Sequence, residues 1–293
     1  MILCDYHMHS EFSSDSDTPM EDMIVRSIDL GLKQICFTDH MDLDFPKICY
    51  KLNEDGQKIF LDFIFDPNEY FKKLTDFREK YKNQIEIGIG IELGLQPHIK
   101  DGVKKLMNDY NFDFAIGSMH LLYQNDPYYE SFWTQATNRI KTINPDVSDE
   151  FIIQSVLRDY FEAILESIKS FPYFQVYGHL DYIVRYAPKK DTYYHPNDYK
   201  DLIDEILKQL IASNRGIEIN TSGLKSGLTY ANPHMDILKR YKELGGSIIT
   251  VGSDAHSPEY VAYQFERARE FLLEAGFEYY TTFMNKEAKF HRL

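Results

Sequence analysis

The chain has 293 residues, of which 43% are hydrophobic and 27% are charged, and this balance is ordinary for a soluble globular protein. A chain of this length can bury a large core, so we expect an ordered protein with one domain over residues 1–293. The formal net charge of −14 argues against a general nucleic-acid binder, because phosphate backbones are held by clusters of lysine and arginine. The 22 tyrosines and 20 phenylalanines are interpreted first as a packing feature.

The cysteines and the N-terminus bear on the compartment. Cys4, Cys36 and Cys49 are too few and too irregularly spaced for a disulfide framework, which favours a reducing cytoplasm. No basic or long apolar segment stands between Met1 and Asp5, so no secretory signal is expected. No stretch reaches the roughly 18 apolar residues that a membrane span needs. We therefore expect a cytoplasmic protein that contacts neither a membrane nor nucleic acid.

Short apolar or β-branched runs alternate along the chain with segments of helical spacing. The predicted strands cover residues 2–6, 34–38, 86–91, 112–117, 174–177, 216–219 and 247–251. The predicted helices cover residues 20–30, 67–82, 97–109, 149–170, 196–213, 233–244 and 258–274. This alternation predicts an α/β fold with a parallel sheet and helices outside it. Seven such units predict a barrel one unit short of the usual eight.

Two long insertions interrupt the alternation, at about residues 42–66 and 121–147. The second insertion carries the only tryptophan, Trp133. Because they follow the second and fourth predicted strands, both would lie over the same face of the barrel. We expect them to form lids or substrate walls there.

Histidines and carboxylates stand at or just past the predicted strand ends, the face on which barrel active sites are built. They are His7, His9, His40, Glu92, His120, His179, Asp254 and His256. Residues two apart on an extended strand point to the same side, so the HxH pair at the first strand can bind one metal. The SDAH segment repeats this spacing with a carboxylate and an imidazole, a mixture that suits zinc, manganese or iron. Glu92 ends an apolar run, where an ionised carboxylate needs a cation, and a bridging position between two metals would meet that need.

These segments carry a family resemblance. DYHMHSEFSSDSD, FTDHMD, GIGIEL, AIGSMH, YGHLDYI and VGSDAHSP resemble, in order and position, the motifs of the PHP (polymerase and histidinol phosphatase) family. The resemblance runs from Asp5 to the end of the chain, and the segment GFEYYTTFMNKEAKF is similar to the monofunctional histidinol-phosphate phosphatase branch. It implies a distorted seven-stranded TIM-like (βα)7 barrel with a centre of three divalent transition metals (Zn, Mn or Fe) at the C-terminal ends of the strands.

The resemblance also implies which residues hold each metal. The first would be bound by His7, His9, Glu92 and Asp254, the second by Glu92, His120 and His179, and the third by Asp15, His40 and His256. Some relatives have histidine where this chain has Asp15. Asp17, in the same serine-rich loop, stays open as the alternative ligand.

The implied function is a metal-dependent phosphomonoesterase that hydrolyses L-histidinol phosphate, a small-molecule phosphate ester, to L-histidinol and phosphate in histidine biosynthesis. Clustered cations neutralise phosphoryl oxygens and lower the pKa of a bound water, so that hydroxide exists at neutral pH. Asp254 or His256 is our candidate to assist proton movement to the leaving group.

Other residues are candidates for substrate binding. Arg185 is our choice for a phosphate clamp, because a guanidinium fork matches phosphate oxygens, and Arg158 is the second candidate. Asp42, Asp44 and the tyrosine-rich insertion are plausible partners for the ammonium and imidazole of histidinol phosphate.

The remaining polar residues receive supporting or ordinary roles. Asp5 and Asp181 are expected to orient neighbouring imidazoles. Gly88 and Gly90 are expected to allow close packing inside the barrel. Ordinary surface or loop positions are expected for His98, His195, His234 and His291.

Three other functions compete with a phosphomonoesterase. A PHP-type phosphodiesterase or exonuclease, or a general phosphoesterase, would use the same fold, but the net charge of −14 argues against action on DNA. A metal-binding module without catalysis belongs to another class, and the complete ligand set argues against it. A hydrolase of C–N bonds would usually carry a bridging modified lysine, and no lysine ends a predicted barrel strand.

Overall fold

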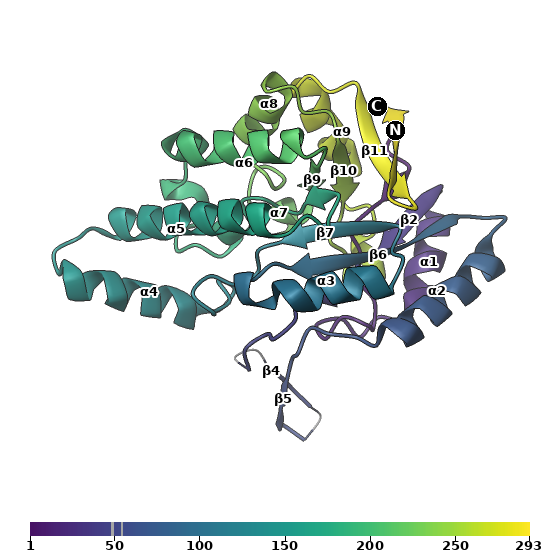
Figure 1. The fold of residues 1–293 in the computed structure, drawn as a ribbon, viewed down its shortest axis with the longest axis horizontal. Helices are drawn as coiled ribbons and strands as arrows, with labels where there is room; N and C mark the ends of the chain where they lie inside the picture. Colours follow the sequence, from purple (N-terminus) through teal and green to yellow (C-terminus); the bar gives the residue numbers. More distant parts are fainter. Residues whose placement is uncertain (48–49, 54) are drawn as a thin grey trace.

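The computed structural model describes residues 1–47, 50–53 and 55–293. Parallel strands run side by side in the order β1, β2, β6, β7, β8, β9 and β10, with helices packed outside them (Figure 1). Their bounds are β1 (Cys4–Asp5), β2 (Gln34–Phe37), β6 (Glu86–Gly94), β7 (Phe114–Ser118), β8 (Val176–Tyr177), β9 (Gly216–Asn220) and β10 (Ile249–Gly252). The predicted seven-stranded α/β barrel is therefore confirmed.

Backbone hydrogen bonds just past β1 bring the two edges of the sheet together. Asp254 donates its N–H to the carbonyl oxygen of His7 at 2.8 Å, and His9 donates its N–H to the carbonyl oxygen of Ala255 at 2.8 Å. The segments that carry the HxH and SDAH motifs thus lie against each other at the seam of the barrel.

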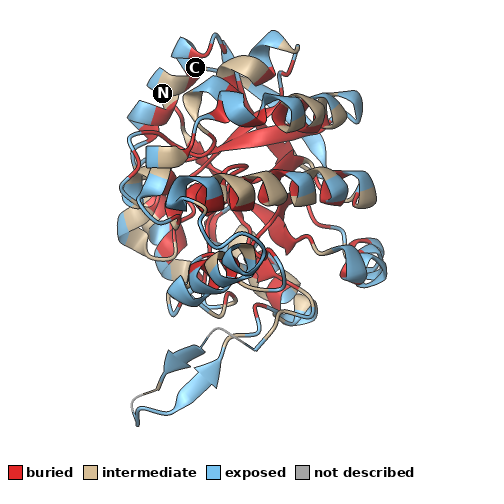
Figure 2. Ribbon diagram, turned by 90° about the vertical axis from the view of Figure 1, so that its left-hand side faces the viewer, coloured by how far each residue is buried: buried red, intermediate tan, exposed pale blue. Residues whose placement is uncertain are grey.

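Helices cover the outside of the barrel and turn their buried sides toward it (Figure 2). The longer ones are α1 (Met20–Asp29), α2 (Pro67–Tyr81), α3 (Lys100–Asp109), α4 (Glu130–Ile143), α5 (Asp149–Ser170), α6 (Lys200–Ala212), α8 (Met235–Glu243) and α9 (Phe265–Glu274). Helix α1 buries Met20, Met23, Ile24 and Ser27, the spacing of one helical face. Short helices follow several strands and turns: η1 (Pro97–Ile99), η2 (Tyr182–Arg185), η3 (Lys190–Tyr193), η4 (Pro196–Tyr199), α7 (Ser222–Lys225) and η5 (Pro258–Tyr260).

Both insertions contain regular structure that the sequence pattern did not predict. The first holds the hairpin of β4 (Tyr50–Leu52) and β5 (Lys58–Phe60), which projects from the body of the protein (Figures 1 and 2). The second holds α4. A short strand, β3 (His40–Met41), follows β2 and pairs with β6 beyond the end of β2.

The last segment of the chain forms the hairpin of β11 (Tyr279–Met284) and β12 (Glu287–Arg292), which was also not predicted. Lys286 donates its N–H to the carbonyl oxygen of Asp113, directly before β7, at 2.7 Å. The ring of Phe283 stacks on Phe114 with centroids 5.2 Å apart, and its carbonyl oxygen accepts from the Tyr6 hydroxyl at 2.7 Å. The hairpin therefore packs at the N-terminal end of the barrel and leaves the C-terminal ends of the strands open.

Three smaller expectations can be compared with the structure. Cys4 and Cys36 are buried and free, and Cys49 lies outside the described residues. A Cβ atom at Gly88 would lie 2.7 Å from Cys36 Sγ, and one at Gly90 would lie 2.6 Å from it, so the expected close packing is confirmed. Within the described ranges, no helix has both the length and the apolar character needed to cross a membrane.

Candidate metal centre

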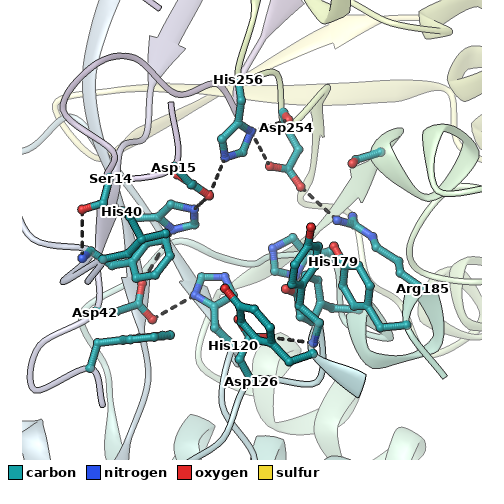
Figure 3. Close-up of a pocket in the computed structure, with 18 of the residues that line it drawn as sticks. Ser14, Asp15, His40, Asp42, His120, Asp126, His179, Arg185, Asp254 and His256 are labelled. Atoms are coloured by element: carbon teal, nitrogen blue, oxygen red, sulfur yellow. Dashed lines mark hydrogen bonds and ion pairs between the residues drawn. The ribbon is translucent and has the colours of Figure 1, made fainter. Parts of the chain in front are cut away.

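The predicted ligands gather in one cluster at the C-terminal ends of the strands. Figure 3 shows the members of this cluster that line the pocket: Asp15, His40, His120, His179, Asp254 and His256. Ligand atoms lie within 4.8 Å of one another in four overlapping groups: His7, His9 and Glu92; His7, His179 and Asp254; His40, Glu92 and His120; His9, His40 and His256. Asp15 joins the cluster through His256, whose Nε2 is 3.2 Å from Asp15 Oδ2. Side chains from six places along the barrel thus form one continuous set of imidazoles and carboxylates.

Glu92 stands at the centre of this set and is fully buried. Its Oε2 lies 3.2 Å from His7 Nε2 and 3.1 Å from His40 Nδ1. Its Oε1 lies 3.1 Å from His120 Nε2 and 3.0 Å from His179 Nε2. The two oxygens therefore face different imidazoles, which is the arrangement that a bridging carboxylate needs.

The backbone around Glu92 differs from the prediction. The third strand was expected to end at residue 91, but β6 runs to Gly94. Pairing of Glu92 with His40 in β3 on one side and with Ile116 in β7 on the other extends the strand. Glu92 therefore projects from within a strand rather than from the turn after it.

Partners outside the cluster orient two of the imidazoles. Glu218 Oε1 lies 2.7 Å from His7 Nδ1, and Asp42 Oδ1 lies 2.9 Å from His120 Nδ1. A carboxylate on one ring nitrogen fixes the tautomer in which the other nitrogen is free to bind a metal. Nε2 of both histidines consequently faces Glu92.

His9 is held differently, by Ser13, whose hydroxyl lies 3.0 Å from His9 Nδ1. The Ser13 hydroxyl in turn donates to Asp39 Oδ1 at 2.8 Å. Burial lowers the pKa of His9 well below its usual value, and the neighbouring imidazoles of His256 and His40 lower it further. This environment favours the neutral imidazole, the form that binds metals.

Three buried atoms at the centre test whether the residues fit a cation. His7 Nε2, His9 Nε2 and Glu92 Oε2 have no hydrogen-bond partner among the described residues. Buried polar atoms without partners are rare, and two imidazole nitrogens with a carboxylate oxygen are a donor set that zinc and related divalent metals prefer. Burial opposes ionisation of Glu92, but the imidazoles of His7 and His120 hold the pKa of its carboxyl well below its usual range. The residues therefore fit divalent transition metals.

Asp15 and Asp17 are distinguished by their surroundings. Asp15 Oδ2 lies 3.2 Å from His256 Nε2 and 3.6 Å from His40 Nε2. The Asp17 side chain is 89% exposed and forms an ion pair with Lys51. The geometry favours Asp15 as the ligand.

Asp254 presents its two oxygens to different groups. Its Oδ1 lies 3.4 Å from His9 Nε2 and 3.7 Å from His7 Nε2, whereas its Oδ2 accepts from Arg185 Nη1 at 3.0 Å. Its backbone has a φ of 57°, a left-handed conformation that aspartate adopts more readily than most residues. Such strained positions are frequent at functional sites.

A cavity of about 760 Å³ lies above the cluster. Its walls include the predicted ligands Asp15, His40, His120, His179, Asp254 and His256. Both insertions contribute to it, the first through Phe45, Tyr50, Lys51, Leu61 and Phe63, and the second through Asp126, Tyr128 and Tyr129. The cluster is therefore reached through a cavity whose walls are partly built by the two insertions.

Comparison with known proteins identifies the family. The PHP domain matches residues 5–222. This chain belongs to the PHP family. The histidinol-phosphatase of Lactococcus lactis subsp. lactis (strain IL1403) is 30% identical over 283 residues, which cover 95% of this chain and 93% of that protein.

Solved structures of similar proteins agree with the PHP barrel. The crystal structure of the histidinol phosphate phosphatase of Lactococcus lactis subsp. lactis, complexed with Zn, L-histidinol and phosphate, matches with a TM-score of 0.80. It is 28% identical in sequence, and the match covers 98% of each chain. A structure from Listeria monocytogenes shares the fold, with a TM-score of 0.70, 19% identity and coverage of 90% of this chain and 99% of that one.

The predicted substrate-binding residues of this PHP protein do not all reach the cavity. Arg185 lines it, although its side chain is only 2% exposed. Arg158 lies on α5, forms an ion pair with Asp201 at 3.0 Å and does not line the cavity, which argues against the prediction that it contacts substrate. Asp42 lines the cavity but is engaged with His120, and Asp44 is 80% exposed and pairs with His98.

Asp5 and Asp181 support the PHP site, but not in the predicted way. Asp5 accepts hydrogen bonds from the backbone N–H groups of Ser253, at 3.0 Å, and Ala262, at 2.9 Å, and so holds the turn that carries Asp254. Asp181 accepts from Asn232 and from the backbone N–H of His234 rather than from an imidazole. The expectation that these two carboxylates orient imidazole rings was therefore wrong.

Sequence reasoning missed several residues that hold the site. Glu218 and Asn220, both fully buried, carried a usable signal, because they alternate with isoleucine in the buried strand β9 and so point to one side. Asn232 also is fully buried and forms an isolated β-bridge with Asn220, yet nothing in its local sequence distinguishes it.

Proposed function

We propose that this PHP protein is a metal-dependent phosphomonoesterase that hydrolyses L-histidinol phosphate to L-histidinol and phosphate. The observation that carries the proposal is the cluster of imidazoles around buried Glu92, open to a cavity of about 760 Å³. The similarity to a phosphatase crystallised with Zn, L-histidinol and phosphate, which extends over 98% of both chains, supports the choice of substrate.

The proposed centre holds three divalent metals. The first would be bound by His7, His9, Glu92 and Asp254, the second by Glu92, His120 and His179, and the third by Asp15, His40 and His256. Zinc is supported by the similar Lactococcus structure, and manganese or iron would suit the same donors. Bound metals would neutralise part of the phosphoryl charge and lower the pKa of a water molecule.

Cationic side chains in the cavity wall are candidates to contact the phosphoryl oxygens. Lys51 is paired with Asp17, and Arg185 is paired with Asp254. Lys225 also lines the cavity, its Nζ lies 3.7 Å over the ring of Tyr260, and it forms no ion pair with a carboxylate of the described residues. We therefore assign phosphate binding to Lys225 together with those N–H groups of Arg185 that are not used within the protein.

Acidic and aromatic side chains suit the organic end of the substrate. The cavity wall includes Asp126, Tyr128, Tyr129, Tyr182 and Tyr186. An ammonium group is attracted by a carboxylate and by aromatic faces, and an imidazole ring can stack between tyrosines. This wall replaces Asp42 and Asp44 as the proposed site for the histidinol moiety.

Asp254 and His256, the two candidates for proton transfer, are better suited to metal binding. Asp254 Oδ2 accepts from Arg185 Nη1 and Asn220 Nδ2, and Oδ1 faces His9 and His7. Oδ2 accepts hydrogen bonds and Oδ1 faces two imidazole nitrogens. Asp254 is therefore better suited to bind a metal than to donate a proton. His256 Nδ1 lies 3.0 Å from the carbonyl oxygen of Asp254 and its Nε2 lies 3.2 Å from Asp15 Oδ2, so His256 too is assigned to metal binding, and a bound metal would stabilise the leaving oxygen.

We also propose a cytoplasmic location. The free thiols of Cys4 and Cys36 support it, because reducing compartments keep thiols free.

The function is tested by phosphate release from L-histidinol phosphate and p-nitrophenyl phosphate and by nucleotide release from single-stranded DNA, after zinc, manganese or iron has been added. We expect kcat/KM to be highest for L-histidinol phosphate by at least about a hundredfold, since a difference of about 2.7 kcal/mol in transition-state binding is available from one charged contact and one ring contact. Equal slow turnover of all three substrates would contradict the substrate and favour a general phosphoesterase. Cleavage of DNA alone would favour the phosphodiesterase branch.

A further inference from the structure

A buried chain of hydrogen bonds leads from Asp181 to Arg185 behind the cavity wall. Asp181 Oδ1 accepts from Asn232 Nδ2 at 2.5 Å, and Asp181 Oδ2 accepts from the backbone N–H of His234 at 2.8 Å and from the Tyr194 hydroxyl at 3.1 Å. Asn232 Oδ1 then accepts from Arg185 Nε at 2.6 Å. Asp181 and Asn232 are fully buried, so these bonds form away from solvent.

The other edge of the same guanidinium reaches the metal cluster. Arg185 Nη1 donates to Asp254 Oδ2 at 3.0 Å, and Arg185 Nη2 donates to Asn220 Oδ1 at 2.8 Å. Asn220 Nδ2 also lies 3.3 Å from Asp254 Oδ2. Asp254 is thereby held by one oxygen, and its other oxygen is turned toward His9 and His7.

We propose that Asn232 is a positioning residue that acts through Arg185 to present a single oxygen of Asp254 to the metal centre. A guanidinium is planar, so acceptors at Nε, Nη1 and Nη2 together fix its plane and its rotation. Asn232 supplies the acceptor at Nε, and Asp181 fixes the amide of Asn232 with its oxygen toward Arg185. Asn232 itself contacts no ligand of the cluster.

The backbone of Asn232 has a separate structural role that a side-chain substitution leaves in place. Its N–H donates to the carbonyl oxygen of Asn220 at 2.9 Å, and its carbonyl oxygen accepts from the N–H of Asn220 at 2.7 Å. Substitutions of the side chain therefore test the amide alone.

The first test is Zn²⁺ affinity, measured by competition with a chelator, in wild-type protein and Asn232→Ala. Loss of groups that orient a ligand typically weakens metal binding by about 10-fold to 100-fold, and we expect about tenfold here because Asn232 acts through one intermediate. Tyr241→Phe is a matched control, because it removes one buried hydrogen bond, to the carbonyl oxygen of Ile248 at 3.0 Å, away from the cluster. We expect the control to stay within about twofold of wild type. Equal Zn²⁺ affinity of Asn232→Ala and wild type would overturn the proposal.

The second test asks whether Asn232 acts through Arg185. In an Arg185→Ala background, Asn232→Ala should change Zn²⁺ affinity by less than about twofold, because the guanidinium that transmits its effect is gone. A further loss of about tenfold in that background would show an effect independent of Arg185 and would overturn the proposal.

If Asn232→Ala does not fold, exchanging the side chains of Asp181 and Asn232 still tests the proposal. Asn232→Asp alone sets two buried carboxylates against each other and should weaken Zn²⁺ binding by about tenfold or more. Asp181→Asn combined with Asn232→Asp restores a donor and an acceptor at the same place, so we expect affinity within about threefold of wild type. An exchanged variant as weak as Asn232→Asp alone would refute the assignment.

This inference rests on the proposed metal centre but not on the substrate. If wild-type protein binds Zn²⁺ and the single, double and exchanged variants of Asn232 behave as expected, the positioning role stands even if L-histidinol phosphate is not hydrolysed. If wild-type protein binds no Zn²⁺, both the centre and the positioning role are wrong.

Discussion

Replacing Glu218 by glutamine tests how strongly the residues outside the cluster control it. Glu218 is fully buried, and its Oε1 lies 2.7 Å from His7 Nδ1. Its Oε2 accepts from the backbone N–H of His179 at 3.0 Å and from Asn220 Nδ2 at 3.1 Å. When His7 Nε2 faces a metal, Nδ1 carries the hydrogen, so both carboxylate oxygens of Glu218 face donors.

Glutamine has one acceptor oxygen and one amide donor in the same space. Whichever way its amide is turned, the NH₂ group faces another donor, either His7 Nδ1 or the N–H groups of His179 and Asn220. An unsatisfied buried donor costs about 1–3 kcal/mol, and 1.4 kcal/mol is a factor of ten in an equilibrium constant. We therefore expect Glu218→Gln to weaken Zn²⁺ binding by about 10-fold to 100-fold.

The assay is Zn²⁺ affinity by chelator competition, followed by phosphate release at saturating Zn²⁺. Glu274→Gln is the matched control, since the side chain of Glu274 is 61% exposed and pairs with Lys239 at the surface. We expect the control to bind Zn²⁺ like wild type. A folded Glu218→Gln protein whose Zn²⁺ affinity equals that of the control would show that this carboxylate does not set the orientation of His7.

Three further predictions concern metal removal, pH and the cavity wall. Removing metal with a chelator should lower the melting temperature in calorimetry, because a ligand present at 100 times its Kd stabilises the folded state by about 2.7 kcal/mol; an unchanged melting temperature would speak against a metal in the folded protein. Hydrogen bonds from Arg240 and Lys200 hold the pKa of the Asp204 carboxyl well below its usual value. The ionised Asp204 therefore stabilises the folded state above about pH 4, and this stabilisation is lost as the pH falls further. Asp204→Asn should therefore lower the free energy of unfolding at pH 7 and differ less from wild type at pH 2.5 in urea titrations, and an equal difference at both pH values would contradict this reasoning. Lys225→Met should raise KM for L-histidinol phosphate about tenfold because a phosphate contact is lost, whereas Arg158→Met should leave kcat/KM within about twofold; equal effects would remove Lys225 from the phosphate site.

The residues of the cluster could be predicted because barrel strands put their C-terminal ends at one place. His7, His9 and Asp254 needed only the correct strand ends and the spacing of two residues along an extended chain. The exact length of each strand depends on pairing in the folded sheet, which the local sequence does not show. Glu92 lies within β6 because β3 and β7 extend the ladder past residue 91.

The two unpredicted hairpins and the long loop helix show where sequence patterns carry little information. The turn between β11 and β12 has positive φ at Asn285 and Lys286, 50° and 65°, which is the geometry of a tight hairpin turn. The usual signal for such a turn is glycine after asparagine, and lysine stands there instead. The local sequence also does not show which arginine lines the cavity. Arg158 and Arg185 could not be told apart by their neighbours, but only Arg185, in the short helix η2, lines the cavity.

The seam of the barrel and the candidate metal centre are built from the same few residues. The backbone bond from Asp254 to His7 closes the sheet, and His7 Nε2 faces both Glu92 Oε2, at 3.2 Å, and Asp254 Oδ1, at 3.7 Å. A cation held between these side chains would therefore link the first and last strands a second time. It would also reduce the repulsion between the carboxylates of Glu92 and Asp254. It follows that loss of metal should loosen the seam before the rest of the barrel. Hydrogen exchange should then rise first at the amides of His9 and Asp254, whose bonds form that seam, while the amides of β6 and β7 stay protected.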